Sequence, residues 1–135
     1  MSIINFECDY TEGAHPRILE RLIATNMEQT SGYGNDPYCA AAREKIKAAC
    51  GTPDADVHFL VGGTQTNTTV LSAILRPYQG AISADEGHIA VHETGAIEAT
   101  GHKVLTLPCE NGKITAAQID ACVEAHYTSG TSEHT

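Results

Sequence analysis

The feature that most constrains the fold is a regular alternation of short apolar runs with helix-like segments in the second half of the 135-residue chain. Apolar runs at residues 57–61, 80–84 and 103–107 predict strands, and helical patterns follow each of them. Strands that alternate with helices form right-handed crossovers, which favour a parallel sheet. The sequence therefore predicts an α/β fold of three layers with these strands in one mainly parallel sheet, the first two running in the same direction.

Each predicted helix carries a start or stop signal, such as an early Pro, an N-cap residue, a terminal Gly or a capping box. Asp36 is the expected N-cap of the second helix and Gly51 its stop, while Thr115 and Gln118 form a capping box before the last helix. The predicted helices cover residues 16–27, 37–50, about 66–76, 88–101 and 115–127.

Composition excludes several classes of protein. Seventeen acidic against eight scattered basic residues give a net charge of −9, and without a basic stripe no nucleic-acid partner is expected. No apolar run is long enough to span a bilayer and no signal peptide is evident, so we expect no membrane partner and a cytosolic location. Five widely spaced cysteines without a CxxC pair indicate neither a disulfide framework nor a zinc site, and we expect reduced, packed thiols.

The segment GGTQTN, residues 62–67, follows the first predicted strand directly. Gly62 and Gly63 allow close approach of a ligand, Thr64 and Thr66 supply hydroxyls, and the free amides at a helix start attract an anion. Phosphate fits this pattern best, although both the Walker sequence and the dinucleotide-binding GxGxxG are absent. The same residues would also serve as a simple tight turn with an N-cap.

A second informative segment, ADEGHIAVHETGA, begins at the end of the next predicted strand. His88 and His92 are spaced to share one face of a helix, with Glu93 pointing elsewhere. Because HExxH is absent, no metal site is expected. His88 is a candidate for a flat ring that stacks on a planar cofactor, and a capping or core histidine is the alternative.

Together these segments resemble a known family. GGTQTN, ADEGHIAVHETGAIEATGHKV, NGKITAAQI and the upstream YGNDP are similar, in order and spacing, to the N-terminal part of low-specificity L-threonine aldolases and related β-eliminating lyases. These are pyridoxal-phosphate enzymes of the aspartate-aminotransferase fold, and the likeness runs from about residue 9 to residue 119. It implies that residues 1–135 are the N-terminal part of an incomplete large domain. We expect an N-terminal arm with helices at 1–55, a cofactor-binding segment at 56–126 and a tail at 127–135.

The resemblance also implies roles for single residues in the cofactor site. Gly63, Thr64 and Gln65 match the loop that holds the phosphate of pyridoxal 5'-phosphate, in agreement with the interpretation of the glycine-rich turn. His88 matches the histidine that stacks on the pyridine ring, and it is the catalytic candidate because a ring placed there is also near the Cβ substituent of a substrate.

Weaker correspondences concern the substrate side. Tyr33 corresponds to a tyrosine at the active-site edge, and Glu93 belongs to a Glu-x-Gly element that follows the stacking histidine. His92 stands where an aromatic residue is common. Cys8 departs from the serine usual at its position, so no carboxylate contact is assigned there.

The implied activity is cleavage of threonine, or another β-hydroxy amino acid, to glycine and an aldehyde by an enzyme that is a homodimer or homotetramer when full length. The Schiff-base lysine and the aspartate that holds the pyridine nitrogen lie beyond the matched region. Lys103 begins a strand and Lys113 lies in a turn, so we expect the chain alone to be inactive. The alternatives are another pyridoxal-phosphate β-eliminating lyase or aminotransferase, a non-catalytic α/β module that binds a phosphorylated ligand, and a non-enzymatic remnant that persists with a partner.

Overall fold

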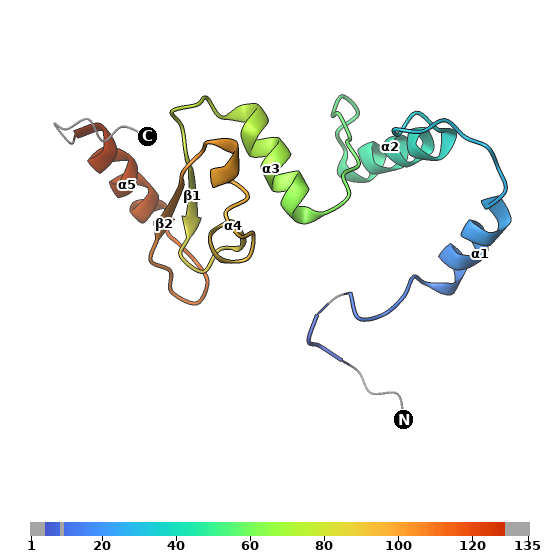
Figure 1. The fold of residues 1–135 in the computed structure, drawn as a ribbon, viewed down its shortest axis with the longest axis horizontal. Coiled ribbons are helices and arrows are strands. Elements are labelled where there is room, and N and C mark those ends of the chain that lie inside the picture. The colour runs from blue at the N-terminus through green and yellow to red at the C-terminus, as the bar shows by residue number, and fades with distance from the viewer. Residues whose placement is uncertain (1–4, 9, 129–135) are drawn as a thin grey trace. The chain divides into compact units, whose positions relative to one another are not determined.

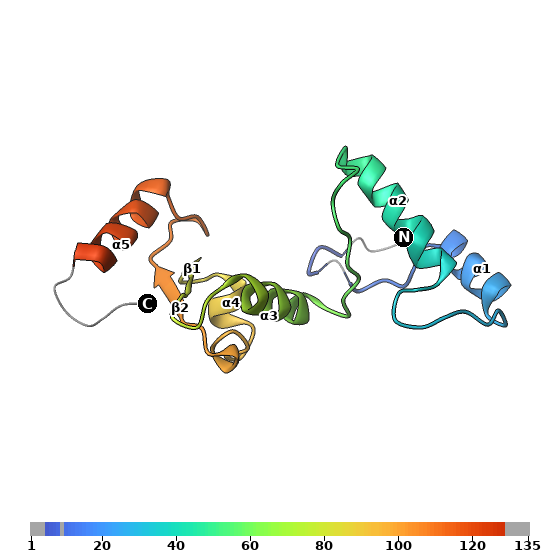
Figure 2. The same ribbon diagram turned by 90° about the horizontal axis from the view of Figure 1, so that it is seen from above.

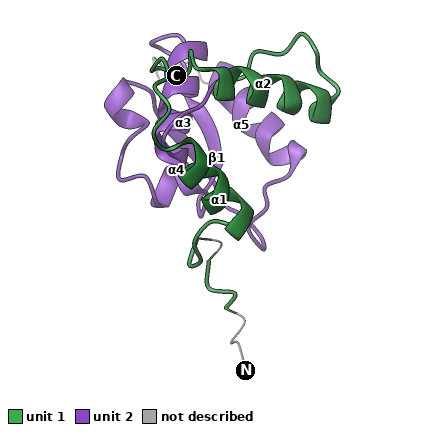
Figure 3. Cartoon of the chain, turned by 90° about the vertical axis from the view of Figure 1, so that its right-hand side faces the viewer, with its two compact units in different colours: residues 1–57 green, residues 58–135 purple. Residues whose placement is uncertain are grey.

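The computed structural model of the protein describes residues 5–8 and 10–128, which belong to two compact units, residues 1–57 and 58–135 (Figure 3). The first unit contains the helices α1 (Pro16–Thr25) and α2 (Pro37–Cys50), drawn in blue and cyan in Figure 1. The second contains α3 (Gly63–Ile74), β1 (Ala81–Ala84), α4 (His88–Val91), β2 (Val104–Leu107) and α5 (Ala116–Thr128), with a short 3₁₀ turn at Glu98–Thr100.

Both ends of α2 form as the sequence predicts. An Asp36 carboxylate oxygen accepts a hydrogen bond from the Cys39 backbone N–H at 2.8 Å, and this cap satisfies one of the free amides of the first turn. Gly51 closes the helix at φ 65°, a conformation that costs glycine little. The Asp36 cap and the Gly51 stop are therefore confirmed.

Arg43 on α2 holds the loop that precedes this helix. Its Nη1 donates to the Gly34 carbonyl at 2.9 Å and its Nε donates to the Val57 carbonyl at 3.2 Å. A Cβ on Gly34, which has φ 74°, would lie 3.0 Å from the guanidinium. Tyr33 next to it also has positive φ, 59°, so the guanidinium secures a turn that the backbone alone would disfavour.

The second unit is built on a parallel pair of strands. Ala81 pairs with Val104 and Ala84 with Leu107, and α4 packs against both strands. The fully buried side chain of Ile97 lies in the segment between α4 and β2. The predicted α/β class is thus confirmed as helices around a small parallel sheet, and the strands expected at 80–84 and 103–107 are both present.

The strand predicted at residues 57–61 is wrong, because this segment has no regular secondary structure. An apolar, β-branched run forms a strand only where a neighbouring strand takes up its backbone groups. Among residues 5–8 and 10–128, no strand pairs with it. The Val61 N–H instead donates to the Gln65 side chain at 3.0 Å.

The helix expected over residues 88–101 is also wrong, because α4 ends at Val91 and only a 3₁₀ turn follows before Gly101 closes the segment at φ 89°. Thr94 and Gly95 take positive φ values of 53° and 75°, which end a right-handed helix. The third predicted helix is correct in kind but begins at Gly63 rather than near Thr66. The Thr115–Gln118 capping box of α5 is confirmed by reciprocal hydrogen bonds at 2.8 and 3.3 Å.

The structure also bears on the cysteines and on the expectation about membranes. All five cysteines are free, but Cys50 is exposed and the others are only half-buried, so the expectation of packed thiols is wrong. Within the described ranges, no helix has the length and apolar character that crossing a membrane requires. The residues of the predicted tail beyond Thr128 lie outside the described residues.

Candidate active site

The amino end of α3 is open. Gly62, its N-cap, is extended at φ −174°, and no side chain caps the helix. A Cβ built on Gly62 or on Gly63 would meet nothing within 4 Å. The backbone N–H groups of the first turn have no partner within a helix, and the helix dipole adds positive character there. This end of α3 therefore offers amide donors and free space to an anion.

The side chains in the first turn of α3 form hydrogen bonds that the sequence does not predict, and these decide which of them can still contact a ligand. The sequence predicts that Thr66 offers its hydroxyl to an anion, yet that hydroxyl donates to the Gly62 carbonyl at 2.9 Å. The Gln65 side-chain oxygen accepts from the Val61 N–H, so the Gln65 residue can offer its backbone N–H and its side-chain Nε2 as donors to a ligand. Thr64 is exposed, and within the described ranges its hydroxyl forms no hydrogen bond. Thr64 is thus the hydroxyl at this helix start that can still donate.

His88 stands where β1 leads into α4, after a tight turn at residues 85–87. The Gly87 N–H donates to the Ala84 carbonyl at 2.8 Å, and a Cβ on Gly87 would lie 2.1 Å from the Ser83 Oγ. Only glycine fits there, and the close turn places His88 directly at the carboxyl end of the sheet. The His88 side chain is 63% exposed, so its ring presents a face to a ligand.

Glu93 connects His88 to α3. Its side chain is fully buried, and its Oε1 lies 2.8 Å from His88 Nδ1 and 2.6 Å from Asn67 Nδ2. Its Oε2 has no hydrogen-bond partner among the described residues. The expectation that Glu93 points away from His88 is wrong, because α4 ends at Val91 and the chain folds back. Figures 1 and 2 show α3 beside this segment.

Asn67 is the residue that sequence reasoning missed. It lies one turn into α3, in the same GGTQTN segment whose glycines and hydroxyls predict an anion site. Asparagine is unfavourable inside a helix, so its place one turn after the cap is the sequence signal that could have drawn attention to a side-chain contact. Through Glu93, Asn67 joins the open start of α3 to the exposed ring of His88 by two short contacts.

His92 lies beside His88, as their spacing predicts. Their ring centroids are 5.4 Å apart with the planes tilted by 51°, and the His92 N–H donates to the His88 carbonyl at 2.9 Å. Across the part of the chain that the structure describes, no group of three His, Cys, Asp or Glu residues could hold a metal ion. The two rings form an exposed pair above the buried carboxylate.

Asp85 and Cys109 link the carboxyl ends of the two strands. The Cys109 N–H donates to an Asp85 carboxylate oxygen at 3.1 Å, and the Asp85 N–H donates to the Leu107 carbonyl at 2.8 Å. Hydrogen bonding from the Cys109 side chain, and then from its N–H, lowers the pKa of Asp85, while the same carboxylate raises the pKa of the Cys109 thiol. A protonated thiol is a poor nucleophile, and the two hydrogen bonds hold the carboxyl ends of β1 and β2 together.

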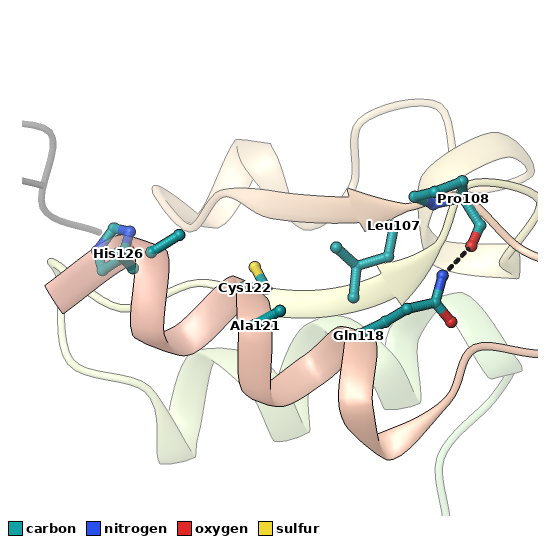
Figure 4. A pocket seen from close by; sticks show the side chains of 7 residues that line it. Leu107, Pro108, Gln118, Ala121, Cys122 and His126 are labelled. Atoms are coloured by element: carbon teal, nitrogen blue, oxygen red, sulfur yellow. Dashed lines mark hydrogen bonds between the residues drawn. The ribbon is translucent and has the colours of Figure 1, made fainter. Parts of the chain in front are cut away.

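A separate cavity of about 640 Å³ lies between α5 and the end of β2, lined by Leu107, Gln118, Ala121, Cys122 and neighbours (Figure 4). Gln118 Nε2 donates to the Pro108 carbonyl at 2.7 Å along its rim. None of the predicted site residues lines this cavity. Tyr33 belongs to the unit of residues 1–57, is fully exposed, and its place at an active-site edge stays a prediction.

The chain as a whole is similar to known proteins. Residues 5–132 match the family described as beta-eliminating lyase. Low-specificity L-threonine aldolases of Pseudomonas sp. (strain NCIMB 10558) and Pseudomonas aeruginosa are 31% and 30% identical over 116 residues, each match covering 84% of this chain and 33% of the relative. A solved structure of the Leishmania major threonine aldolase is 47% identical, with a TM-score of 0.85 over 93% of this chain and 36% of that one.

These matches cover most of this chain but only part of each relative. The chain spans about a third of the length of the curated relatives that it matches, whereas the family match covers nearly all of the chain. The predicted resemblance to threonine aldolases is confirmed by these matches. The chain belongs to the beta-eliminating lyase family.

Proposed function

We propose that this chain carries the phosphate-binding and ring-stacking part of a pyridoxal-phosphate-dependent carbon–carbon lyase of the threonine aldolase type. The observation that carries the proposal is the path from Asn67 through Glu93 to His88, which couples an open helix start to an exposed aromatic ring. Family membership and the names of the relatives support it. In the same proposal, the small parallel sheet is part of a three-layer, aspartate-aminotransferase-like large domain.

The residues present fit the cofactor. The backbone amides of Gly63, Thr64 and Gln65 and the Thr64 hydroxyl would hold the phosphate, because this helix start has free space and no side-chain cap. His88 offers a flat, exposed ring for a planar pyridine. Bound pyridoxal phosphate supplies an electron sink that weakens the Cα–Cβ bond of an amino acid.

His88 is the candidate for proton transfer near the substrate. Cleavage of threonine to glycine and acetaldehyde removes the proton of the β-hydroxyl as the Cα–Cβ bond breaks, and an imidazole nitrogen can accept that proton. Glu93 and His92 contact or neighbour His88 and complete the substrate side in this proposal. A β-hydroxy amino acid is the proposed substrate; a cytosolic homodimer or homotetramer is the proposed full-length form.

Titration of the chain with pyridoxal phosphate, pyridoxal and inorganic phosphate, followed by nuclear magnetic resonance of the backbone amides, tests the assignment. We expect pyridoxal phosphate and phosphate to shift the amide signals of Gly63, Thr64 and Gln65. Only pyridoxal phosphate should also shift the ring signals of His88. Pyridoxal, which lacks the phosphate, should bind much more weakly.

Each other outcome has a defined meaning. Ligand-induced shifts that spare residues 63–65, for example shifts confined to the cavity under α5, would contradict the phosphate assignment. A response of residues 63–65 to both phosphate-bearing ligands without any response of His88 would instead indicate a non-catalytic phosphate-binding module.

A further inference from the structure

The Glu93 carboxylate is an unusual group in this structure because it is fully buried and only one of its oxygens is satisfied. Both of its contacts, from Asn67 Nδ2 and His88 Nδ1, converge on Oε1. Oε2 is buried and has no partner among the described residues. A buried carboxylate is costly unless donors compensate it, so each of the two donors on Oε1 matters.

The contact with His88 determines where a proton lies on the imidazole ring. A neutral imidazole carries a hydrogen on one nitrogen and a lone pair on the other. A carboxylate oxygen 2.8 Å from Nδ1 accepts a hydrogen bond from an N–H at that position. Asn67 Nδ2 can only donate, so it requires Oε1 to be an acceptor as well.

We propose that Glu93 is a positioning residue that, supported by Asn67, keeps a proton on Nδ1 of His88 and leaves Nε2 as the ring's proton-accepting atom. The His88 side chain is 63% exposed while Glu93 is buried, so the carboxylate holds the ring from behind and leaves the rest of it accessible. A carboxylate or carbonyl behind a functional histidine commonly fixes its tautomer and orientation in this way.

Asn67 extends this arrangement to the phosphate-binding end of α3. It lies on the same helix as Gly63 and Thr64, one turn further on, so the donor to Glu93 and the proposed phosphate contacts belong to one helix. The further step, in which Nε2 receives a proton from a substrate hydroxyl, rests on the proposed function. The tautomer of His88 is independent of that function and can be measured without a cofactor.

The test is nitrogen-15 spectroscopy of the chain with labelled histidine, correlating the ring nitrogens with the carbon-bound ring protons. Loss of one signal set in His88→Gln assigns His88. At alkaline pH, where the spectrum no longer changes, we expect a protonated, pyrrole-type Nδ1 and a lone-pair, pyridine-type Nε2. A pyridine-type Nδ1 in the unmodified protein would overturn the proposal, whatever any variant shows.

Variants separate positioning from general structure. In Glu93→Gln the side-chain carbonyl can still accept from both donors, so the tautomer should be retained. In Glu93→Ala the two ring signals should exchange character, toward the Nε2–H tautomer that predominates in free histidine. Glu98→Gln changes an exposed carboxylate in the same segment and should leave His88 unaltered. Unchanged amide signals of β1 and β2 would show that the variants fold.

Failure of the two proposals can be told apart. If His88 shows the expected tautomer but pyridoxal phosphate does not shift residues 63–65, the proposed function fails and the positioning role stands. If the cofactor binds as expected and Glu93→Ala leaves the His88 tautomer unaltered, the positioning role fails and the proposed function stands.

Discussion

In the proposed phosphate site, Thr64 is the side chain expected to contact the anion, since the Thr66 hydroxyl already donates to the Gly62 carbonyl. We expect Thr64→Ala to weaken binding of pyridoxal phosphate by ~1.5–3 kcal/mol, the typical contribution of a hydrogen bond to a charged group. This corresponds to a roughly 10- to 150-fold higher dissociation constant, measurable by calorimetry.

The matched control for Thr64→Ala lies on the same helix. Thr69 is exposed on α3 and away from its first turn, so Thr69→Ala tests the effect of losing a threonine without touching the proposed phosphate contacts. Affinity should remain unchanged in this control. Equal affinities for all three proteins would show that the Thr64 hydroxyl does not reach the phosphate.

Gly87 is a second residue whose identity is set by its surroundings. A Cβ there would lie 2.1 Å from Ser83 Oγ and 2.9 Å from the Ala84 carbonyl oxygen, which is backbone and cannot move cheaply. Gly87→Ala should therefore destabilise the β1–α4 turn by ~1–3 kcal/mol. The measurement is faster hydrogen exchange of the β1 amides. Gly32→Ala, where a Cβ meets nothing within 4 Å, should leave exchange unchanged and serves as the control.

At the scale of elements, the Asp36 cap makes α2 sensitive to acid. Hydrogen bonds from the Cys39 side chain and backbone N–H lower the pKa of Asp36 below its ordinary value of 3.8. A lowered folded-state pKa means that the stabilisation is present above the unfolded-state pKa and is lost as pH falls through the folded-state value. We expect helix content, followed by circular dichroism, to drop with acid below about pH 3.8.

Asp36→Asn provides the comparison for that titration. The neutral side-chain oxygen of asparagine caps a helix about as well as aspartate and has no proton to gain in this range. The variant should therefore lose less helix content between neutral pH and acid. Identical acid profiles of the two proteins would place the acid-sensitive group elsewhere.

Elements with local signals could be predicted from the sequence, and elements that depend on distant partners could not. The ends of α2 and the capping box of α5 are set by residues within one turn of each other, so their patterns suffice. The segment 57–61 has the composition of a strand, but pairing is a property of the neighbour and not of the segment. The break after Val91 is followed by positive φ at Thr94, a conformation that threonine rarely adopts, and Gly95 next to it is the sequence signal for this break.

The same contrast applies to the candidate site. The glycines at 62 and 63 and the exposed ring of His88 could be predicted because each acts through its own local geometry. The contact of Glu93 with His88 and Asn67 could not, since the sequence pattern predicts a continuous helix over residues 88–101, in which Glu93 points away from His88. Gly95, two residues after Glu93, was the available signal that this helix would end.

At the scale of the whole molecule, we predict no aldolase activity from this chain alone with added pyridoxal phosphate. Lys103 lies at the amino end of β2, opposite the edge of the sheet that carries His88. Lys113 is exposed in a turn where its N–H and carbonyl bond to Glu110. Neither lysine is placed to bind the cofactor covalently, so acetaldehyde release from threonine should equal that of cofactor in buffer.

If the chain did release acetaldehyde above the blank, two variants would show whether the candidate site is responsible. Turnover clearly above the cofactor blank, abolished by His88→Ala and retained in Thr69→Ala, would show that the chain itself is a catalyst. It would also show that a covalent lysine is not required, and the assignment of essential residues would have to change.

The early end of α4 affects how substitutions in this segment would act on stability and on the candidate site. In an uninterrupted helix, residues 88 and 93 would be separated by about 140° around the axis, because each residue advances by roughly 100°. Substitutions that extend α4 beyond Val91 would make the backbone more regular, but they would turn the Glu93 carboxylate away from the His88 ring. A longer α4 would therefore stabilise this segment but would break the contact between Glu93 and His88. A library of variants selected only for thermal resistance should be enriched in proteins with a longer α4 that lack this contact.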